Sequence, residues 1–213
     1  MTKRHAAENL KLLDDRLQRE DEDRWLSSRY APSQARAKLT ALYAFNLELA
    51  KVRTIVSEPM LGAIRFQWWR DALEEIAAEG TAPRKHDVVL AMAGAGLETG
   101  LCMALIDGHE KAFEASDRGL EPENLLMGAA ADMLVSGHGW GEHIEQLAPA
   151  YAQARLGEGV DQSLRNLTLP KVPTLIRPAI SHAILRKAYA RGKRPGPLGK
   201  RFAIMWAMLS GKA

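Results

Sequence analysis

The sequence lacks the residues that several classes of protein require. It has one cysteine in 213 residues, Cys102, which excludes a disulfide scaffold and a cysteine-rich metal site. Its longest apolar stretches, residues 88–97 and 202–209, are too short to cross a bilayer. Asp14 and Asp15 argue against a secretory signal or an acid-poor transit peptide at the N-terminus. We therefore expect a soluble, cytoplasmic protein of a reducing compartment.

Patterns typical of β-strands are also missing. Val, Ile and Thr do not alternate with polar residues over a useful length. Helical periodicity instead recurs between Gly and Pro residues. We expect helices at residues 6–19, 21–28, 33–53, 58–79, 85–97, 99–116, 121–135, 141–156, 173–190 and 197–210. The sequence therefore predicts an all-α helical bundle forming a single domain over residues 1–213.

Charge is distributed unevenly along the chain. Residues 161–213 contain eleven Lys or Arg and one acid, whereas the first 160 residues carry 18 bases and 25 acids. A basic third of this kind favours an anionic partner. The alternative is that it docks on the acidic stretch at 107–145. Nucleic acid is not expected as a partner, because the basic third lacks interleaved aromatic residues and any recognised motif.

Carboxylate side chains are the first candidates for a catalytic site. Mg²⁺ is a hard cation that proteins bind through carboxylate oxygens, so the candidates are Asp and Glu side chains on one face of a helix. Asp71, Glu74 and Glu75 have the spacing of ligands on one helix face, although a solvated acidic face has the same spacing. If the chain were an enzyme that uses Mg²⁺, we would expect Asp71, Glu75 and Asp107 to be its catalytic residues.

Other candidate groups favour structural interpretations. Asp14, Asp15, Asp21 and Asp23 lie in a charged N-terminal region and are expected to be solvated. His138 and His143 are poorly spaced for a shared metal ion. Cys102 lies between apolar residues and is expected in the core. No metal site is predicted from these residues.

An aromatic motif runs from Arg65 to Arg70, with two adjacent tryptophans, Trp68 and Trp69. On a helix Arg65 lies one turn before both indoles, so its guanidinium group could stack on one of them. The alternative is core packing, in which the tryptophans join the 58–79 helix to the 33–53 helix.

Residues 42–53, 56–59 and 62–70 resemble the squalene/phytoene synthase family, and Asp23-Arg24-Trp25 fits the same pattern. The resemblance is strong over residues 21–79 and looser towards the C-terminus. It implies a bundle of the isoprenoid synthase type around a central cavity. The chain is short for an enzyme of this family.

The departures from the family pattern concern its metal site. In active members an Arg and an Asp-rich Mg²⁺ motif follow the Tyr-Ala-Phe stretch. Here the Arg position is Leu47, and the aspartate positions fall on Ala50, Lys51 and Thr54. Without anionic ligands, and with Lys51 and Arg53 nearby, such a site cannot hold Mg²⁺. The pattern more closely resembles the divergent branch that includes a mitochondrial assembly factor of respiratory complex I.

The resemblance therefore implies a non-catalytic assembly or scaffold protein with a respiratory-complex protein as partner and no cofactor. Two alternatives remain: a head-to-head prenyl-diphosphate transferase that uses Mg²⁺, and a non-catalytic protein that binds an isoprenoid lipid. Candidate binding residues are Tyr43, Asn46, Lys51, Arg53, Arg65 and Trp68.

The basic C-terminal region provides a second candidate surface. Lys193, Arg194, Lys200 and Arg201 lie beside an apolar run that includes Phe202 and Trp206. This pattern fits peripheral attachment to an anionic inner-membrane surface, or docking on a protein partner. Because Phe202 and Trp206 are four residues apart, they could instead form a core face.

Overall fold

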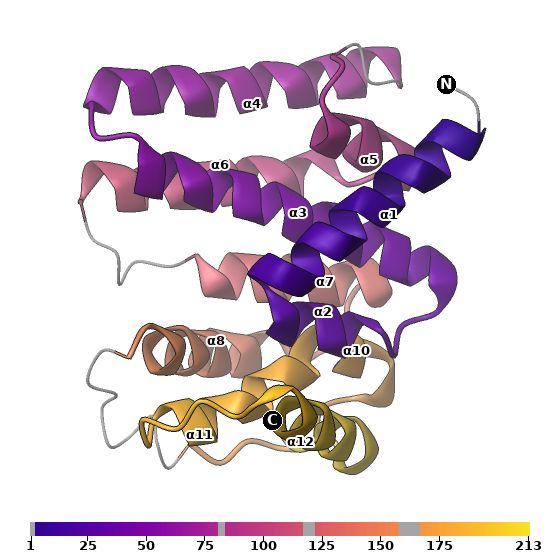
Figure 1. Ribbon diagram of the computed structural model, residues 1–213, viewed down its shortest axis with the longest axis vertical. Helices are drawn as coiled ribbons and strands as arrows, with labels where there is room; N and C mark the ends of the chain where they lie inside the picture. Colours follow the sequence, from indigo (N-terminus) through magenta and orange to yellow (C-terminus); the bar gives the residue numbers. More distant parts are fainter. Residues whose placement is uncertain (1–2, 81–83, 117–121, 158–166) are drawn as a thin grey trace.

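The computed structural model describes residues 3–80, 84–116, 122–157 and 167–213, and all regular elements within these ranges are helical. The all-α fold predicted from the sequence is therefore confirmed (Figure 1). The first eight helices are α1 (Lys3–Glu20), α2 (Glu22–Ser28), α3 (Ser33–Ile55), α4 (Pro59–Glu79), α5 (Asp87–Ala95), α6 (Thr99–Glu114), α7 (Glu123–Leu134) and α8 (Gly141–Leu156).

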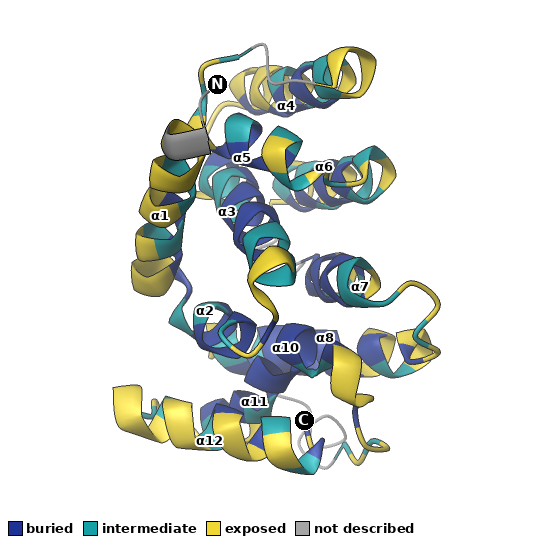
Figure 2. Cartoon of the chain, turned by 90° about the vertical axis from the view of Figure 1, so that its right-hand side faces the viewer, coloured by how far each residue is buried: buried dark blue, intermediate teal, exposed yellow. Residues whose placement is uncertain are grey.

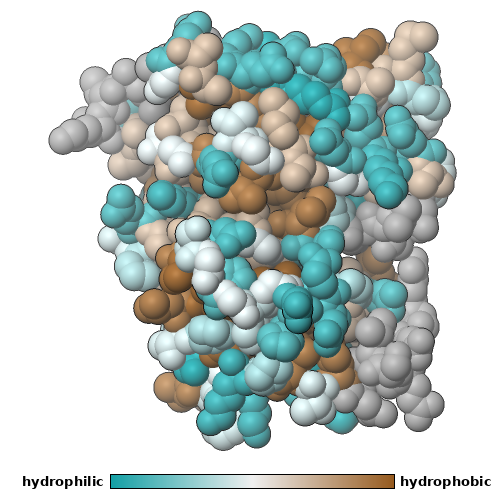
Figure 3. All heavy atoms as spheres, turned by 180° about the vertical axis from the view of Figure 1, so that it is seen from behind, coloured by the Kyte–Doolittle hydropathy of each residue, from teal (hydrophilic) through white to brown (hydrophobic). Residues whose placement is uncertain are grey.

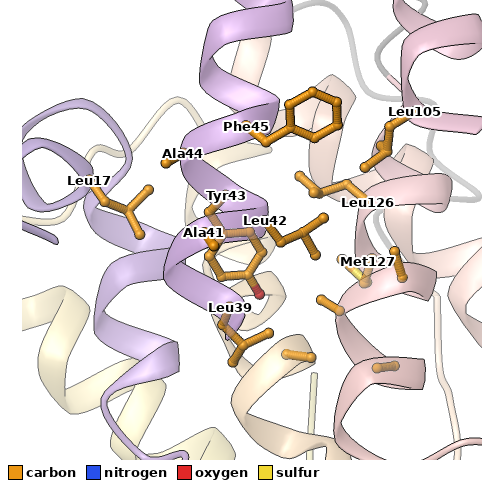
Figure 4. Close-up of a cluster of buried hydrophobic side chains, with 14 of the residues drawn as sticks. Leu17, Leu39, Ala41, Leu42, Tyr43, Ala44, Phe45, Leu105, Leu126 and Met127 are labelled. Atoms are coloured by element: carbon orange, nitrogen blue, oxygen red, sulfur yellow. The ribbon is translucent and has the colours of Figure 1, made fainter. Parts of the chain in front are cut away.

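The helix α3 forms the centre of the bundle, because it contacts α1, α2, α4, α5, α6 and α7. All its residues from Leu39 to Asn46 are buried, and a helix that is apolar on every side belongs in a core. Figure 4 shows Leu42 of α3 facing Leu126 and Met127 of α7. The helix expected at residues 33–53 therefore forms the core of the molecule.

Helix α4 packs mainly on α6 (Figure 1). The two approach closely at Gly62, where an added Cβ would lie 2.1 Å from Cε1 of Phe113. Trp69 is buried and its ring lies 5.2 Å from that of Phe45 on α3. The prediction that the tryptophans pack these helices together is confirmed for Trp69, whereas Trp68 is only partly buried.

The C-terminal region differs from the single helix expected at 173–190. It forms the short turns η1 (Thr174–Ile176), α10 (Arg177–Ile180), η2 (Ser181–Leu185) and α11 (Arg186–Tyr189). Pro178 lies in the first turn of α10, and because proline has no N–H it cannot extend the preceding turn as a regular helix. Ser27 of α2 donates its hydroxyl to the carbonyl of Pro178 at 2.8 Å, which fixes this segment against the N-terminal part of the chain.

The last helix, α12 (Pro197–Ser210), lies at one end of the molecule and packs on η2, α2 and α10. Most of it is exposed (Figure 2). Ile204 and Ala207 face the interior, but Phe202 and Trp206 are 65% and 59% exposed. The interpretation of Phe202 and Trp206 as a core face is therefore wrong, because the core contacts of α12 come from its opposite side.

Outside the core, hydrophobic and hydrophilic surface are interspersed on the face seen in Figure 3. In the part of the chain that the structure describes, no helix has the length and hydropathy needed to span a membrane.

Candidate functional site

A pocket of about 280 Å³ opens where α2, α3, α7 and α8 meet. We call it the charged pocket. Its lining residues are Asp21, Arg24, Asn46, Leu47, Ala50, Glu123, Ala152, Arg155 and Leu156. The pocket therefore brings together α3, which carries the family resemblance, and charged residues from elements that precede and follow it.

Arg24 lies at the centre of the pocket's charges. Its guanidinium group bonds to the carboxylates of both Asp21 and Glu123, and all three side chains are buried. Although burial lowers the pKa of an arginine, the two carboxylates outweigh this effect and keep Arg24 charged. Each of the two acids thus has one oxygen bound to the guanidinium group of Arg24.

Asp21 has a second cationic partner, because Arg155 of α8 lies 3.0 Å from its Oδ1 atom. Burial alone would raise the pKa of Asp21, but the charges of Arg155 and Arg24 outweigh burial and hold this pKa at about 2. With two arginines facing two acids, the charges of the pocket neutralise one another.

Asp23 joins four elements just beside the pocket. Its Oδ2 accepts hydrogen bonds from the hydroxyls of Tyr151 on α8 at 3.0 Å and Tyr189 on α11 at 2.7 Å. Its Oδ1 lies 2.8 Å from Nζ of Lys200 on α12. Burial would raise the pKa of Asp23, but Lys200 and Tyr189, aided by Arg155, outweigh burial and lower it. Asp23 therefore connects α2 to α8 and to the C-terminal helices.

Two buried histidines lie near these groups. His109 of α6 shares a hydrogen bond of 2.9 Å with Oδ1 of Asn46, and burial, aided by Arg53 and Arg24, lowers its pKa to about 3. Burial also lowers the pKa of His182, although Nε2 of His182 is 3.9 Å from the carboxylate of Glu123. Both imidazoles are therefore neutral at pH 7.

Two of the four positions that the resemblance assigns to the family's arginine and metal ligands lie at this pocket. Leu47 and Ala50 line it. Lys51 forms ion pairs with Glu20 at 3.3 Å and Glu48 at 3.9 Å, and the hydroxyl of Thr54 donates to backbone carbonyls of its own helix. None of these side chains supplies an anionic oxygen to a magnesium ion.

A test for Mg²⁺ against the carboxylates that are present gives the same answer. Asp21 and Glu123 are paired with arginines, and a divalent cation would have to displace or approach those positive charges. Over the described ranges, no three His, Cys, Asp or Glu side chains are grouped closely enough to hold a metal ion. The donor set of the charged pocket does not fit Mg²⁺.

The residues named for a prenyl transferase do not line the charged pocket. Asp71 accepts a hydrogen bond from Gln67 at 2.7 Å, Glu75 pairs with Arg84, and Asp107 pairs with Arg70. The structure places them on α4 and α6, each bonded to another side chain, and no three acids among the described residues are grouped closely enough there to hold a metal ion.

The predicted binding residues are dispersed. Tyr43 is buried in the core and Asn46 lines the charged pocket. Arg53 lines a separate pocket of about 410 Å³ with Phe113. Arg65 is exposed, and the guanidinium group over the ring of Trp68 is that of Arg84, at 4.8 Å. Stacking on an indole, which was one alternative for Arg65, is made instead by Arg84, which also donates to the carbonyl of Trp68.

The four basic residues predicted for a membrane or partner surface have different environments. Lys200 is 20% exposed and pairs with Glu22 and Asp23. Arg194 lies over the ring of Tyr189 and donates to the carbonyl of Arg155. Lys193 and Arg201 are exposed. Lys200 thus connects α12 to α2 through ion pairs. Its ammonium group faces α2 rather than the acidic stretch at 107–145.

Asp21 and Asp23 correct the sequence interpretation. Their sequence context predicts a solvated surface, but they are 2% and 3% exposed. Their burial follows from cations and hydroxyls that the C-terminal half brings to α2. The one local indication is the spacing of Asp21 and Arg24, three residues apart on a helix. Glu123, Arg155 and His182 have no local indication at all.

Fold and site together define a helical bundle of the isoprenoid synthase type whose central pocket carries arginine–carboxylate pairs. The chain matches the squalene/phytoene synthase family over residues 17–127, just over half its length, and it belongs to that family.

Curated relatives carry a more specific name. The chain is 32% identical to "NADH dehydrogenase (ubiquinone) complex I, assembly factor 6" of Homo sapiens over 100 residues, which are 46% of this chain and 30% of the human protein. The proteins of the same name from Rattus norvegicus and Bos taurus are 32% and 31% identical over the same shares. The matched region thus spans less than a third of these relatives. No solved structure matches the chain.

Proposed function

We propose that this chain is a non-catalytic member of the squalene/phytoene synthase family that assists the assembly of a respiratory complex of the complex I type through protein contact. The observation that carries the proposal is the charged pocket. Leu47 and Ala50 stand there in place of the family's arginine and its first metal ligand. Arg24 binds the two carboxylates that line the pocket, those of Asp21 and Glu123. The names of the curated relatives supply the biological process.

The alternatives receive less support from the same pocket. Prenyl transfer requires carboxylates that converge on Mg²⁺, whereas Asp71, Glu75 and Asp107 are each engaged elsewhere. An isoprenoid tail requires apolar walls, whereas buried charges of both signs line the charged pocket. We place the chain at the surface of the inner membrane that contains the respiratory complex, as a peripheral protein on its cytoplasmic side.

The enzymatic alternative is tested with purified chain, Mg²⁺, and farnesyl or geranylgeranyl diphosphate. We expect no pyrophosphate release above a heat-denatured control, under conditions in which an active squalene synthase turns over. Metal-dependent release would overturn the non-catalytic assignment.

The assembly function is tested by deleting the gene for this chain and resolving membrane complexes on native gels. We expect less assembled complex I and slower NADH oxidation by isolated membranes, with succinate oxidation unchanged as the control. Re-expression of the wild-type chain should restore both. Normal amounts of complex I in the deletion strain would refute the proposal.

A further inference from the structure

Helix α12 presents an apolar face to solvent. Leu198, Phe202, Trp206 and Leu209 follow one another at spacings of four, four and three residues, so they share one side of the helix. They are 68%, 65%, 59% and 73% exposed. A surface helix normally turns its apolar face inward, and α12 already buries Ile204 and Ala207 on the opposite side. The outward face is therefore additional to what the fold requires.

This apolar face continues into a groove of about 320 Å³ between α2 and α12. The walls of the groove include Trp25 and Tyr30 from α2 and the turn that follows it, and Phe202 and Met205 from α12. Tyr30 is 45% exposed, and tyrosine and tryptophan suit an environment that is apolar at one end and wet at the other. We call the exposed face of α12 together with this groove the α12 surface.

The C-terminal part of the chain that forms α12 carries charged side chains of one sign. The described residues 167–213 contain no Asp or Glu. The side chains of Lys193 and Arg201 form no ion pair or hydrogen bond with any residue that the structure describes. Burial and the nearby cations Arg186, Lys212 and Arg191 lower the pKa of Lys187. The charges of Lys193 and Arg201 are thus not neutralised by any described residue, whereas Glu22 and Asp23 of α2 neutralise Lys200.

We propose that the α12 surface attaches the chain to an anionic phospholipid bilayer, with α12 lying in the headgroup region and its exposed side chains inserted below the phosphates. Apolar side chains flanked by Lys and Arg are the pattern of helices that lie in a membrane interface. A second copy of the chain fits less well, because two such surfaces would set uncompensated positive charges against each other.

This inference specifies the membrane attachment that the proposed function assumes, and its test does not depend on assembly. Purified chain is mixed with vesicles of phosphatidylglycerol and phosphatidylcholine in equal amounts, or of phosphatidylcholine alone, and centrifuged. We expect binding to the anionic vesicles that weakens as salt increases, and much weaker binding to the neutral ones. Equal binding to both vesicles, or to neither, would overturn the proposal.

Two sets of variants identify the surface. Phe202→Ser with Trp206→Ser should weaken binding at least about a hundredfold, because most of the inserted apolar area is lost. Arg201→Gln should weaken it about fivefold, and Lys193→Gln with Arg201→Gln about 25-fold. All four side chains are exposed, so unchanged circular dichroism and melting temperature should accompany each loss.

Matched controls come from the opposite end of the molecule. Met60 and Ile64 on α4 are 76% and 58% exposed, so Met60→Ser with Ile64→Ser removes a comparable apolar area. Arg65→Gln on the same helix removes an exposed arginine. These variants should bind vesicles like the wild type. The proposal would be overturned if the control variants lost as much vesicle binding as the α12 variants. It would also be overturned if the chain did not bind vesicles but formed a dimer in solution that Phe202→Ser with Trp206→Ser abolished.

Discussion

The hydroxyl of Tyr189 donates a hydrogen bond of 2.7 Å to Asp23, a residue 166 positions earlier in the sequence. Both side chains are buried. Because Asp23 also binds Tyr151 and Lys200, this one carboxylate holds the N-terminal and C-terminal parts of the bundle together. Its partners give the first prediction.

Tyr189→Phe should lower the free energy of unfolding by about 1.5–3 kcal/mol, because a buried hydrogen bond to a charged group is lost while the ring stays in place. Urea denaturation measures the change. Tyr30→Phe is the control, since that ring is 45% exposed, and it should be neutral. Equal effects of the two substitutions would show that Asp23 does not depend on Tyr189.

Arg24→Met should destabilise the fold by about 3–5 kcal/mol, because Asp21 and Glu123 are left buried without their shared partner. Arg70 provides a matched control, since it too binds two acids, Asp107 and Glu110, but nearer the surface. Arg70→Met should cost no more than about 1 kcal/mol. The prediction fails if Arg24→Met is as mild as the control in urea denaturation.

Stability should depend on pH through His109. Its pKa in the folded protein is about 3, below the value of about 6.5 for an unfolded histidine. Between these values the unfolded chain binds a proton that the folded chain does not. The stability is therefore fully present above about pH 6.5 and falls by up to about 1.4 kcal/mol per unit as pH decreases.

His109→Gln removes this titrating group while its amide can still donate to Asn46. The slope of unfolding free energy against pH between 6 and 4 should become shallower than in the wild type. His5→Gln is the control, since that side chain is 70% exposed. An unchanged slope in the His109 variant would mean that this histidine is protonated in the folded protein.

Gly62→Ala should destabilise the chain by about 1–3 kcal/mol, because the new methyl group would overlap the ring of Phe113. Gly94→Ala on α5 is the opposite case, since a Cβ added there would have nothing within 4 Å, and it should be neutral or stabilising by up to about 1 kcal/mol. Phe113→Leu should restore part of the loss in the Gly62 variant. Thermal melts of the three proteins decide between these outcomes.

The bundle could be predicted where the determinants are local. Pro32 precedes α3, and Gly80 ends α4 with a φ of +65°, so residues next to a helix set its ends. The place of Leu47 and Ala50 could also be predicted, because the resemblance puts both at site positions of the family and both line the charged pocket. Neither prediction required knowledge of distant contacts.

The pairs of the charged pocket could not be predicted in the same way. Asp23 has the sequence context of a solvated acid, and only contacts with Tyr189 and Lys200 bury it. The sequence also does not determine which face of α12 packs on the rest of the protein. The periodicity of Phe202 and Trp206 defines one face of a helix but does not say whether that face turns inward.

The bonds of Asp23 also bear on the order in which the chain folds. During synthesis α1 to α7 leave the ribosome before Lys200, so α2 carries a carboxylate whose ammonium partner does not yet exist. Contacts between residues so far apart in the sequence form late, because closing a long loop costs conformational entropy. The contacts of α2 with α12 therefore form after those with α1 and α3, and until then Asp23 lacks its ammonium partner.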